Sequence, residues 1–166
     1  MIELLTNLKL IFFVMFFFLM LIVESYYPER KWSSGRIVRI GFHGLIALIN
    51  TVIMRVPTLF LVIPALLITN ENDYGILNNY DYNFLTKALL SLVLLDFAFY
   101  WWHRINHTVG FFWRFHSVHH LDTHLDVTTS LRFHIGELIF SSIFKAALIF
   151  IIGIPISIFI FYEIIL

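Results

Sequence analysis

The stretch LIFFVMFFFLMLIV, residues 10–23, is an unbroken run of fourteen apolar residues. Leu4, Leu5 and Leu8 extend it backward to about the 20 residues that a helix needs to cross the hydrocarbon core of a bilayer. The ESYYPER that follows lacks the small-residue pattern of a cleavage site, which favours a retained anchor over a signal peptide. The run therefore predicts a membrane-spanning helix.

The composition of the whole chain agrees with a membrane protein. Of 166 residues, 60% are hydrophobic and 13% are charged, against about 25% charged residues in average soluble domains. The mean hydropathy is +0.86. The formal net charge is zero, which indicates no nucleic-acid partner. The chain contains no cysteine, so disulfides, thiolate zinc sites and iron–sulfur clusters are excluded.

Three further apolar blocks follow the first, at residues 40–69, 88–102 and 146–162. The block at 40–69 is too long for one straight span, and Arg55, Pro57 and Pro64 interrupt it. It predicts a kinked span or a helix with a re-entrant piece. We expect an all-α integral membrane bundle of about four spans.

The loops between these blocks differ in charge. Residues 70–83 contain no Lys or Arg, whereas residues 24–39 and the histidine-rich segment are basic. The basic residues are Arg30, Lys31, Arg36, Arg39, Arg104, Arg114 and Arg132. Cytoplasmic loops carry an excess of Lys and Arg. This pattern predicts a multi-pass protein whose histidine cluster lies on the cytoplasmic side.

The histidine-rich segment is WWHRINHTVGFFWRFHSVHHLDTH, residues 101–124, and it contains six of the eight histidines. Residues three or four apart share one face of a helix, and imidazole is the commonest side-chain metal ligand near neutral pH. The five candidate metal ligands with this spacing are His103, His107, His116, His119 and His120. Nitrogen ligands without thiolate suit zinc, copper, iron or nickel.

Other polar residues allow more than one interpretation. His43, alone on an apolar helix, is interpreted as a satisfied interfacial side chain. Asp96, an acid in an apolar segment, is either functional or a hydrogen-bonded helix contact. Three carboxylates follow His120 in the sequence, and each is either a metal ligand or a hydrogen-bond partner of a ligating ring. They are Asp122, Asp126 and Glu137.

Several enzyme classes lack their signatures here. The chain has no HExxH, Glu-x-x-His, GxSxG, GxGxxG or P-loop motif. An oxygen-activating or hydrolytic histidine site beside the lipid remains.

The segment LLDFAFYWWHRINHTVGFFWRFHSVHHLDTHLDVTTSLRFHIGE, residues 94–137, resembles the fatty acid hydroxylase/sterol desaturase superfamily. The resemblance lies in an Asp-led His-x3-His box and a Trp-x-x-His-x-x-His-His box that starts at Trp113. It implies a non-heme di-iron oxidoreductase that uses O2 to hydroxylate or desaturate a fatty acyl chain or sterol. It also implies that the five candidate histidines bind two iron ions, or zinc in a purified protein. His134 matches a recurrent family position, and His124 is expected to be a surface histidine.

The resemblance divides the chain into membrane-anchoring spans at residues 1–87 and a fatty acid hydroxylase-like region at residues 88–166. Family members continue to a third histidine box, so we expect this chain to be the N-terminal portion of such an enzyme. The implied partners are a lipid or sterol substrate, the membrane, a separate electron-donor protein and a C-terminal half that carries the remaining histidines. Two alternatives stay open: a membrane protein that binds metal or heme without oxygenase activity, and a structural membrane segment.

Overall fold

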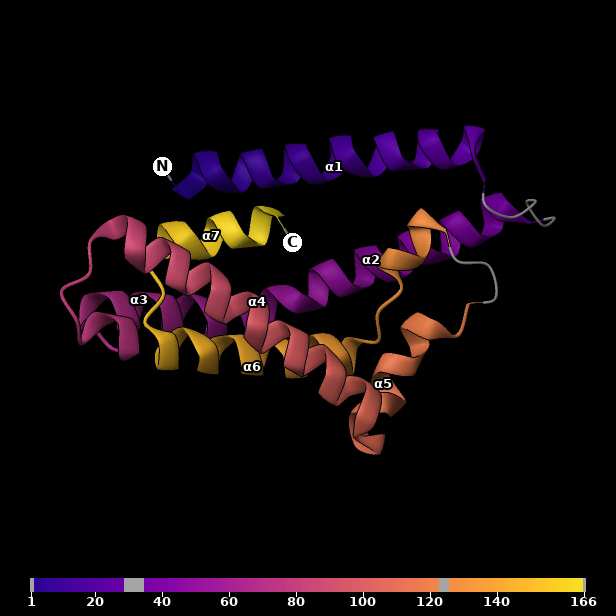
Figure 1. The fold of residues 1–166 in the computed structure, drawn as a ribbon. Coiled ribbons are helices and arrows are strands. Elements are labelled where there is room, and N and C mark those ends of the chain that lie inside the picture. The colour runs from indigo at the N-terminus through magenta and orange to yellow at the C-terminus, as the bar shows by residue number, and fades with distance from the viewer. Residues whose placement is uncertain (1, 29–34, 123–125, 166) are drawn as a thin grey trace.

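Every element in the described part of the chain is a helix (Figure 1). The computed structural model describes residues 2–28, 35–122 and 126–165. The elements are α1 (Ile2–Tyr26), α2 (Arg36–Pro57), the π-helical η1 (Thr58–Val62), α3 (Ile63–Glu71), the 3-10 helix η2 (Ile76–Asn78), α4 (Phe84–Thr108), α5 (Gly110–His120), the 3-10 helix η3 (Val127–Leu131), α6 (Ile135–Ile152) and α7 (Ile156–Ile165). The predicted all-α class is confirmed.

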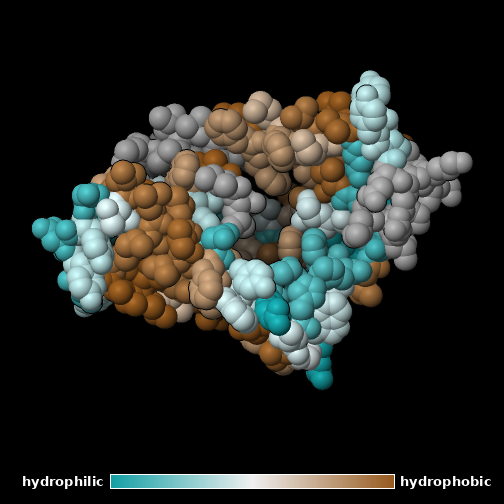
Figure 2. All heavy atoms as spheres, in the orientation of Figure 1, coloured by the Kyte–Doolittle hydropathy of each residue, from teal (hydrophilic) through white to brown (hydrophobic). Residues whose placement is uncertain are grey.

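Three described segments are long and apolar enough to cross a membrane: 36–78, α4 and α6. The helices direct large apolar side chains outward, as at Phe16, Phe60 and Val93. Brown, hydrophobic atoms accordingly cover much of the face in Figure 2, while teal and white atoms gather over α5. A helix bundle that exposes this much apolar surface has lipid as its solvent. The protein is an integral membrane protein.

The second apolar block stays helical throughout, because α2, η1 and α3 follow one another without a break. The re-entrant alternative for this block is therefore wrong. Pro57 has no N–H to donate, and the interruption that it causes takes the form of the π-helical turn Thr58–Val62. This local adjustment lets the chain pass a proline while the backbone groups remain hydrogen-bonded.

The last apolar block does not form one span as expected at residues 146–162. Instead α6 is the span, and it begins earlier, at Ile135. It ends at Gly153, whose left-handed φ of 80° caps the helix, and Pro155 follows. Polar residues in the first half of α6 obscured its start in the hydropathy pattern.

The packing of α4 on α6 and α7 sets the position of the histidine segment. Leu95 and Ile149 have no exposed surface. Trp102 of α4 stacks on Phe144 of α6 at 4.6 Å between ring centroids, and its indole Nε1–H donates to Ser141 Oγ at 2.9 Å. The C-terminal end of α4 is thus held against the N-terminal half of α6, where the functional site lies.

Candidate metal centre

The two histidine-bearing helices form a tight hairpin. Helix α4 ends at Thr108, and α5 starts at Gly110 after one extended residue, Val109. The ring of Trp102 contacts that of Phe112 at 5.2 Å. The connection is so short that the last turns of α4 lie against α5, which brings both predicted histidine boxes together.

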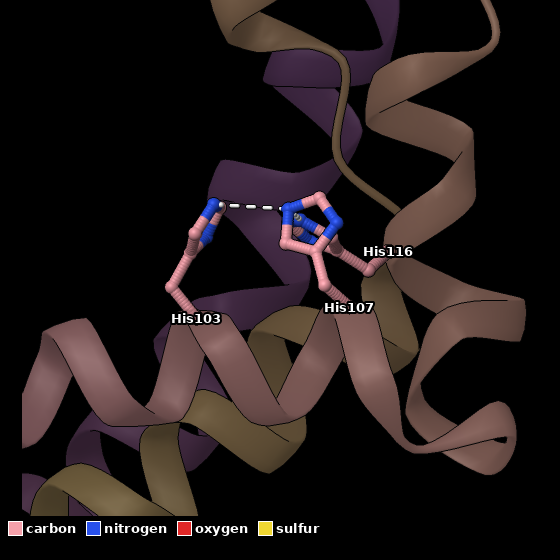
Figure 3. Close-up of side chains that lie close together, drawn as sticks. All are labelled: His103, His107 and His116. Atoms are coloured by element: carbon pink, nitrogen blue, oxygen red, sulfur yellow. Dashed lines mark hydrogen bonds between the residues drawn. The ribbon is translucent and has the colours of Figure 1, made fainter.

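Three imidazole rings converge inside this hairpin, and a fourth adjoins them. The ligand nitrogens of His103, His107 and His116 all lie within 4.8 Å of one another. The Nε2 atom of His107 lies 3.1 Å from that of His103 and 3.2 Å from that of His116. The Nε2 atom of His120 lies 3.1 Å from that of His116. Figure 3 shows the rings of His103 and His107 rising from one helix to meet the ring of His116. We call these four residues the four-histidine cluster.

Hydrogen bonds alone cannot satisfy the four-histidine cluster. The nitrogen of a neutral ring either donates one proton or accepts with one lone pair. Yet the Nε2 atoms of His107 and His116 each have two nitrogen neighbours at 3.1–3.2 Å. A cation accepts all the lone pairs at once, and ligands about 2.0–2.1 Å from one ion lie about 2.9–3.4 Å apart. The donor set therefore fits a metal ion.

Two rings of α5, those of His116 and His120, are held in the neutral form that a metal requires. Burial, together with the nearby rings of His107 and His119, lowers the pKa of His116 to about 4. Burial and the neighbouring rings, that of His116 foremost, also lower the pKa of His120. At neutral pH both rings offer lone pairs.

His119, the fifth candidate ligand, lies beside the cluster. Its ring stacks on Phe133 with 4.7 Å between centroids and 5° between planes. Its Nδ1 atom is buried and has no hydrogen-bond partner among the described residues. No motif in the sequence indicates that Phe133 supports this ring. A buried, unpaired imidazole nitrogen can accept a hydrogen bond from water or bind a metal ion.

Glu137 of α6 completes the support of the cluster. The Nδ1–H of His116 donates to Glu137 Oε1 at 2.7 Å, and the two side chains are 1% and 8% exposed. Because one ring nitrogen holds the proton, the Nε2 lone pair of His116 points into the cluster. Of the two roles open for Glu137, the structure shows a contact that suits a partner of a ligating ring.

The remaining polar residues lie outside the four-histidine cluster. His134 caps α6, where its Nδ1 atom accepts from Gly136 N at 2.9 Å. Asp122 and Asp126 pair with Arg39 at 3.1 and 3.2 Å. Asp96 is exposed on α4. His124 lies outside the described residues.

The ring of Trp113 packs against two members of the cluster. It stacks on the ring of His120 at 5.8 Å and lies 5.5 Å from that of His107. The tryptophan of the second box thus covers the metal-facing rings and restricts their rotation.

This chain is similar in sequence to known lipid-modifying enzymes. Residues 88–166 match the fatty acid hydroxylase family. The alkylglycerol monooxygenase of Xenopus tropicalis is 32% identical over 120 residues, which are 70% of this chain and 26% of that protein. The ornithine lipid hydroxylase OlsE of Rhizobium tropici is 32% identical over 73 residues, which are 44% of this chain and 22% of that protein. The chain thus spans about a quarter of the length of these relatives. No solved structure matches it significantly.

Proposed function

Since residues 88–166 belong to the fatty acid hydroxylase superfamily, we propose that this chain is part of a membrane-bound, iron-dependent oxidoreductase that hydroxylates a lipid. The observation that carries the proposal is the convergence of the ligand nitrogens of His103, His107 and His116 within 4.8 Å of one another. The Nε2 atom of His120 adjoins that of His116 at 3.1 Å. The names of two relatives, a monooxygenase and a hydroxylase of lipids, favour hydroxylation over desaturation.

The metal ligands in this proposal are the five histidines of the two boxes. These five rings would hold two iron ions, with His103, His107 and His116 around one of them. Bound iron would supply the redox chemistry by which one oxygen atom of O2 is inserted into a lipid C–H bond, while the other is reduced to water by two external electrons and two protons. Glu137 keeps the proton of His116 on Nδ1. Phe133 and Trp113 fix the planes of the rings that they contact.

The substrate, the electrons and the remaining ligands come from outside the chain in this proposal. Five rings are too few for two six-coordinate ions, so further histidines come from a C-terminal half that is absent from these 166 residues. The substrate is an acyl or alkyl lipid that enters from the bilayer. Figure 2 shows a hollow at the centre of the drawn face, between apolar surface and the polar end that carries α5. Electrons come from a separate donor protein on the cytoplasmic side.

The test measures metal and lipid separately. The full chain is purified in nanodiscs, loaded anaerobically with Fe(II), and its iron content is measured by mass spectrometry. Membranes that contain the chain together with the corresponding C-terminal half are exposed to ¹⁸O2, and their lipids are screened for incorporated ¹⁸O. We expect bound iron and labelled hydroxyl groups in the parent and the loss of both in the H107A/H116A double variant. The control R114A, which changes an exposed residue on the same helix as His116, should retain both. Bound zinc with unlabelled lipids would instead support metal binding without oxygenase activity.

A further inference from the structure

Three polar side chains of α2 reach the segment that follows α5. They are Arg39, His43 and Asn50, and we call them the α2 clamp. Arg39 Nη2 lies 3.1 Å from Asp122 Oδ1, and His43 Nε2 lies 3.2 Å from Asp122 Oδ2. Asp122 is two residues beyond His120. The α2 clamp therefore contacts the chain directly after the second histidine box.

His43 of the clamp is buried and contacts polar groups through both of its ring nitrogens. The side chain of His43 is 2% exposed and that of Asp122 is 9% exposed. The other ring nitrogen of His43, Nδ1, lies 2.8 Å from Thr128 Oγ1. A ring that is bonded on both nitrogens cannot rotate without leaving a buried polar group unpaired, which is unfavourable. His43 is thus a fixed link between α2 and the two ends of the segment that it contacts.

The third member of the clamp, Asn50, reaches His119 indirectly, through Phe133. Asn50 Nδ2 donates to the backbone carbonyl of Phe133 at 2.9 Å. The ring of Phe133 is the one on which His119 stacks. Two independent contacts from α2 therefore lead to the same turn of α5, one through Asp122 and one through Phe133.

We propose that the α2 clamp consists of positioning residues for the His119–His120 end of α5, so that the metal centre is incomplete without α2. The clamp lies outside residues 88–166, the region that matches the family. Its link to metal binding depends on the proposed function, in which His119 and His120 are ligands.

The first experiment measures position in the metal-free protein. Because the chain has no cysteine, spin labels can be placed only where cysteines are introduced, at the exposed positions Arg104 of α4 and Leu121 at the end of α5. The distribution of distances between the labels is measured by pulsed electron paramagnetic resonance in nanodiscs. We expect one narrow distribution in the parent and a distribution at least twice as broad in H43A and D122N.

A matched control and a gentler variant complete this experiment. T51V removes a hydrogen bond of α2 that does not reach α5, Thr51 Oγ1 to Ala47 O at 2.8 Å, and should leave the distribution unchanged. If D122N loses its helical circular dichroism, R39K carries the same test. It retains the charge but loses the guanidinium fork that contacts both Asp122 and Asp126.

The second experiment measures Co(II) affinity and the visible Co(II) spectrum in the unlabelled variants. Loss of a supporting contact typically lowers metal affinity by about 10–100-fold, and we expect this loss, with an altered spectrum, in H43A and D122N but not in T51V. A distribution that stays narrow, or a broad one with unchanged affinity, would overturn the inference. If the parent binds no metal while the distributions change as expected, the proposed function fails and the positioning role of the clamp stands.

Discussion

Glu137 accepts a short hydrogen bond from His116, with 2.7 Å between Oε1 and Nδ1. At the residue scale, we expect metal binding to depend on this hydrogen bond. In E137Q the neutral amide accepts the His116 proton less strongly, so the Nε2 lone pair binds metal more weakly. We expect about a 10–100-fold loss of metal affinity, measured by competition with a chelator of known affinity.

The matched control for this prediction is E163Q. Glu163 pairs with Lys145 at 2.5 Å on α7, away from the four-histidine cluster. Its replacement should leave metal affinity within twofold of the parent. Equal losses in both variants would mean that the effect of E137Q comes from loosening of the bundle and not from His116.

The depressed pKa of His116 predicts a pH dependence of stability. The ring titrates near 6.5 in the unfolded chain and near 4 in the folded protein. Between these values the unfolded state binds the additional proton, so stability falls as the pH is lowered from about 6.5 to about 4. Denaturant titration of the metal-free protein at pH 7 and pH 4.5 measures the fall. In H116N the fall should be smaller, and an identical fall would contradict the assignment.

At the scale of elements, the turn between α6 and α7 depends on two glycines that meet. A Cβ atom on Gly75 would lie 2.2 Å from the backbone nitrogen of Gly153, and Gly75 has a φ of +106°. A side chain there adds strain of about 1–3 kcal/mol from the backbone conformation alone, besides the clash. We expect G75A to unfold at clearly lower denaturant in bicelles.

Gly44 of α2 provides the opposite case. A Cβ there would meet nothing within 4 Å, and alanine is favoured over glycine in a helix by about 0.5–1 kcal/mol. G44A should therefore be as stable as the parent or slightly more stable. If G75A behaves like G44A, the close approach of the two loops does not occur in the membrane.

At the scale of the molecule, the bundle separates its polar groups into two ends. The start of α2, the end of α4 and the start of α6 lie with the histidines at one end, and the acidic loop between α3 and α4 lies at the other (Figure 1). With Arg36, Arg39 and Arg104 at the histidine end, the charge rule favours this end for the cytoplasm.

Single introduced cysteines test this orientation. Asn79 lies in the acidic loop and Arg114 on α5, and both are exposed. In intact cells, a membrane-impermeant maleimide should modify N79C and not R114C, while both should react after the cells are opened. Modification of R114C in intact cells would reverse the proposed topology.

The helical bundle and the two histidine-bearing helix faces could be predicted because both depend on local pattern. Long apolar runs require helices in lipid, since every backbone group must be bonded within its own segment. Spacings of three and four place imidazoles on one helical face. The same reasoning failed at α6, because Glu137, Ser141, Ser142 and Lys145 lower the hydropathy of a segment whose polar groups bond inside the protein.

The sequence by itself determined that this protein is a helical membrane protein with two histidine boxes on adjacent helices. Only the tertiary structure decided which rings meet at their Nε2 atoms, that Glu137 holds His116, and that His43 binds Asp122 in place of standing alone on its helix. Helical periodicity determines the face on which a side chain lies. The contacts of α2 with the segment between α5 and α6 depend instead on packing between residues 83 and 85 positions apart in the sequence.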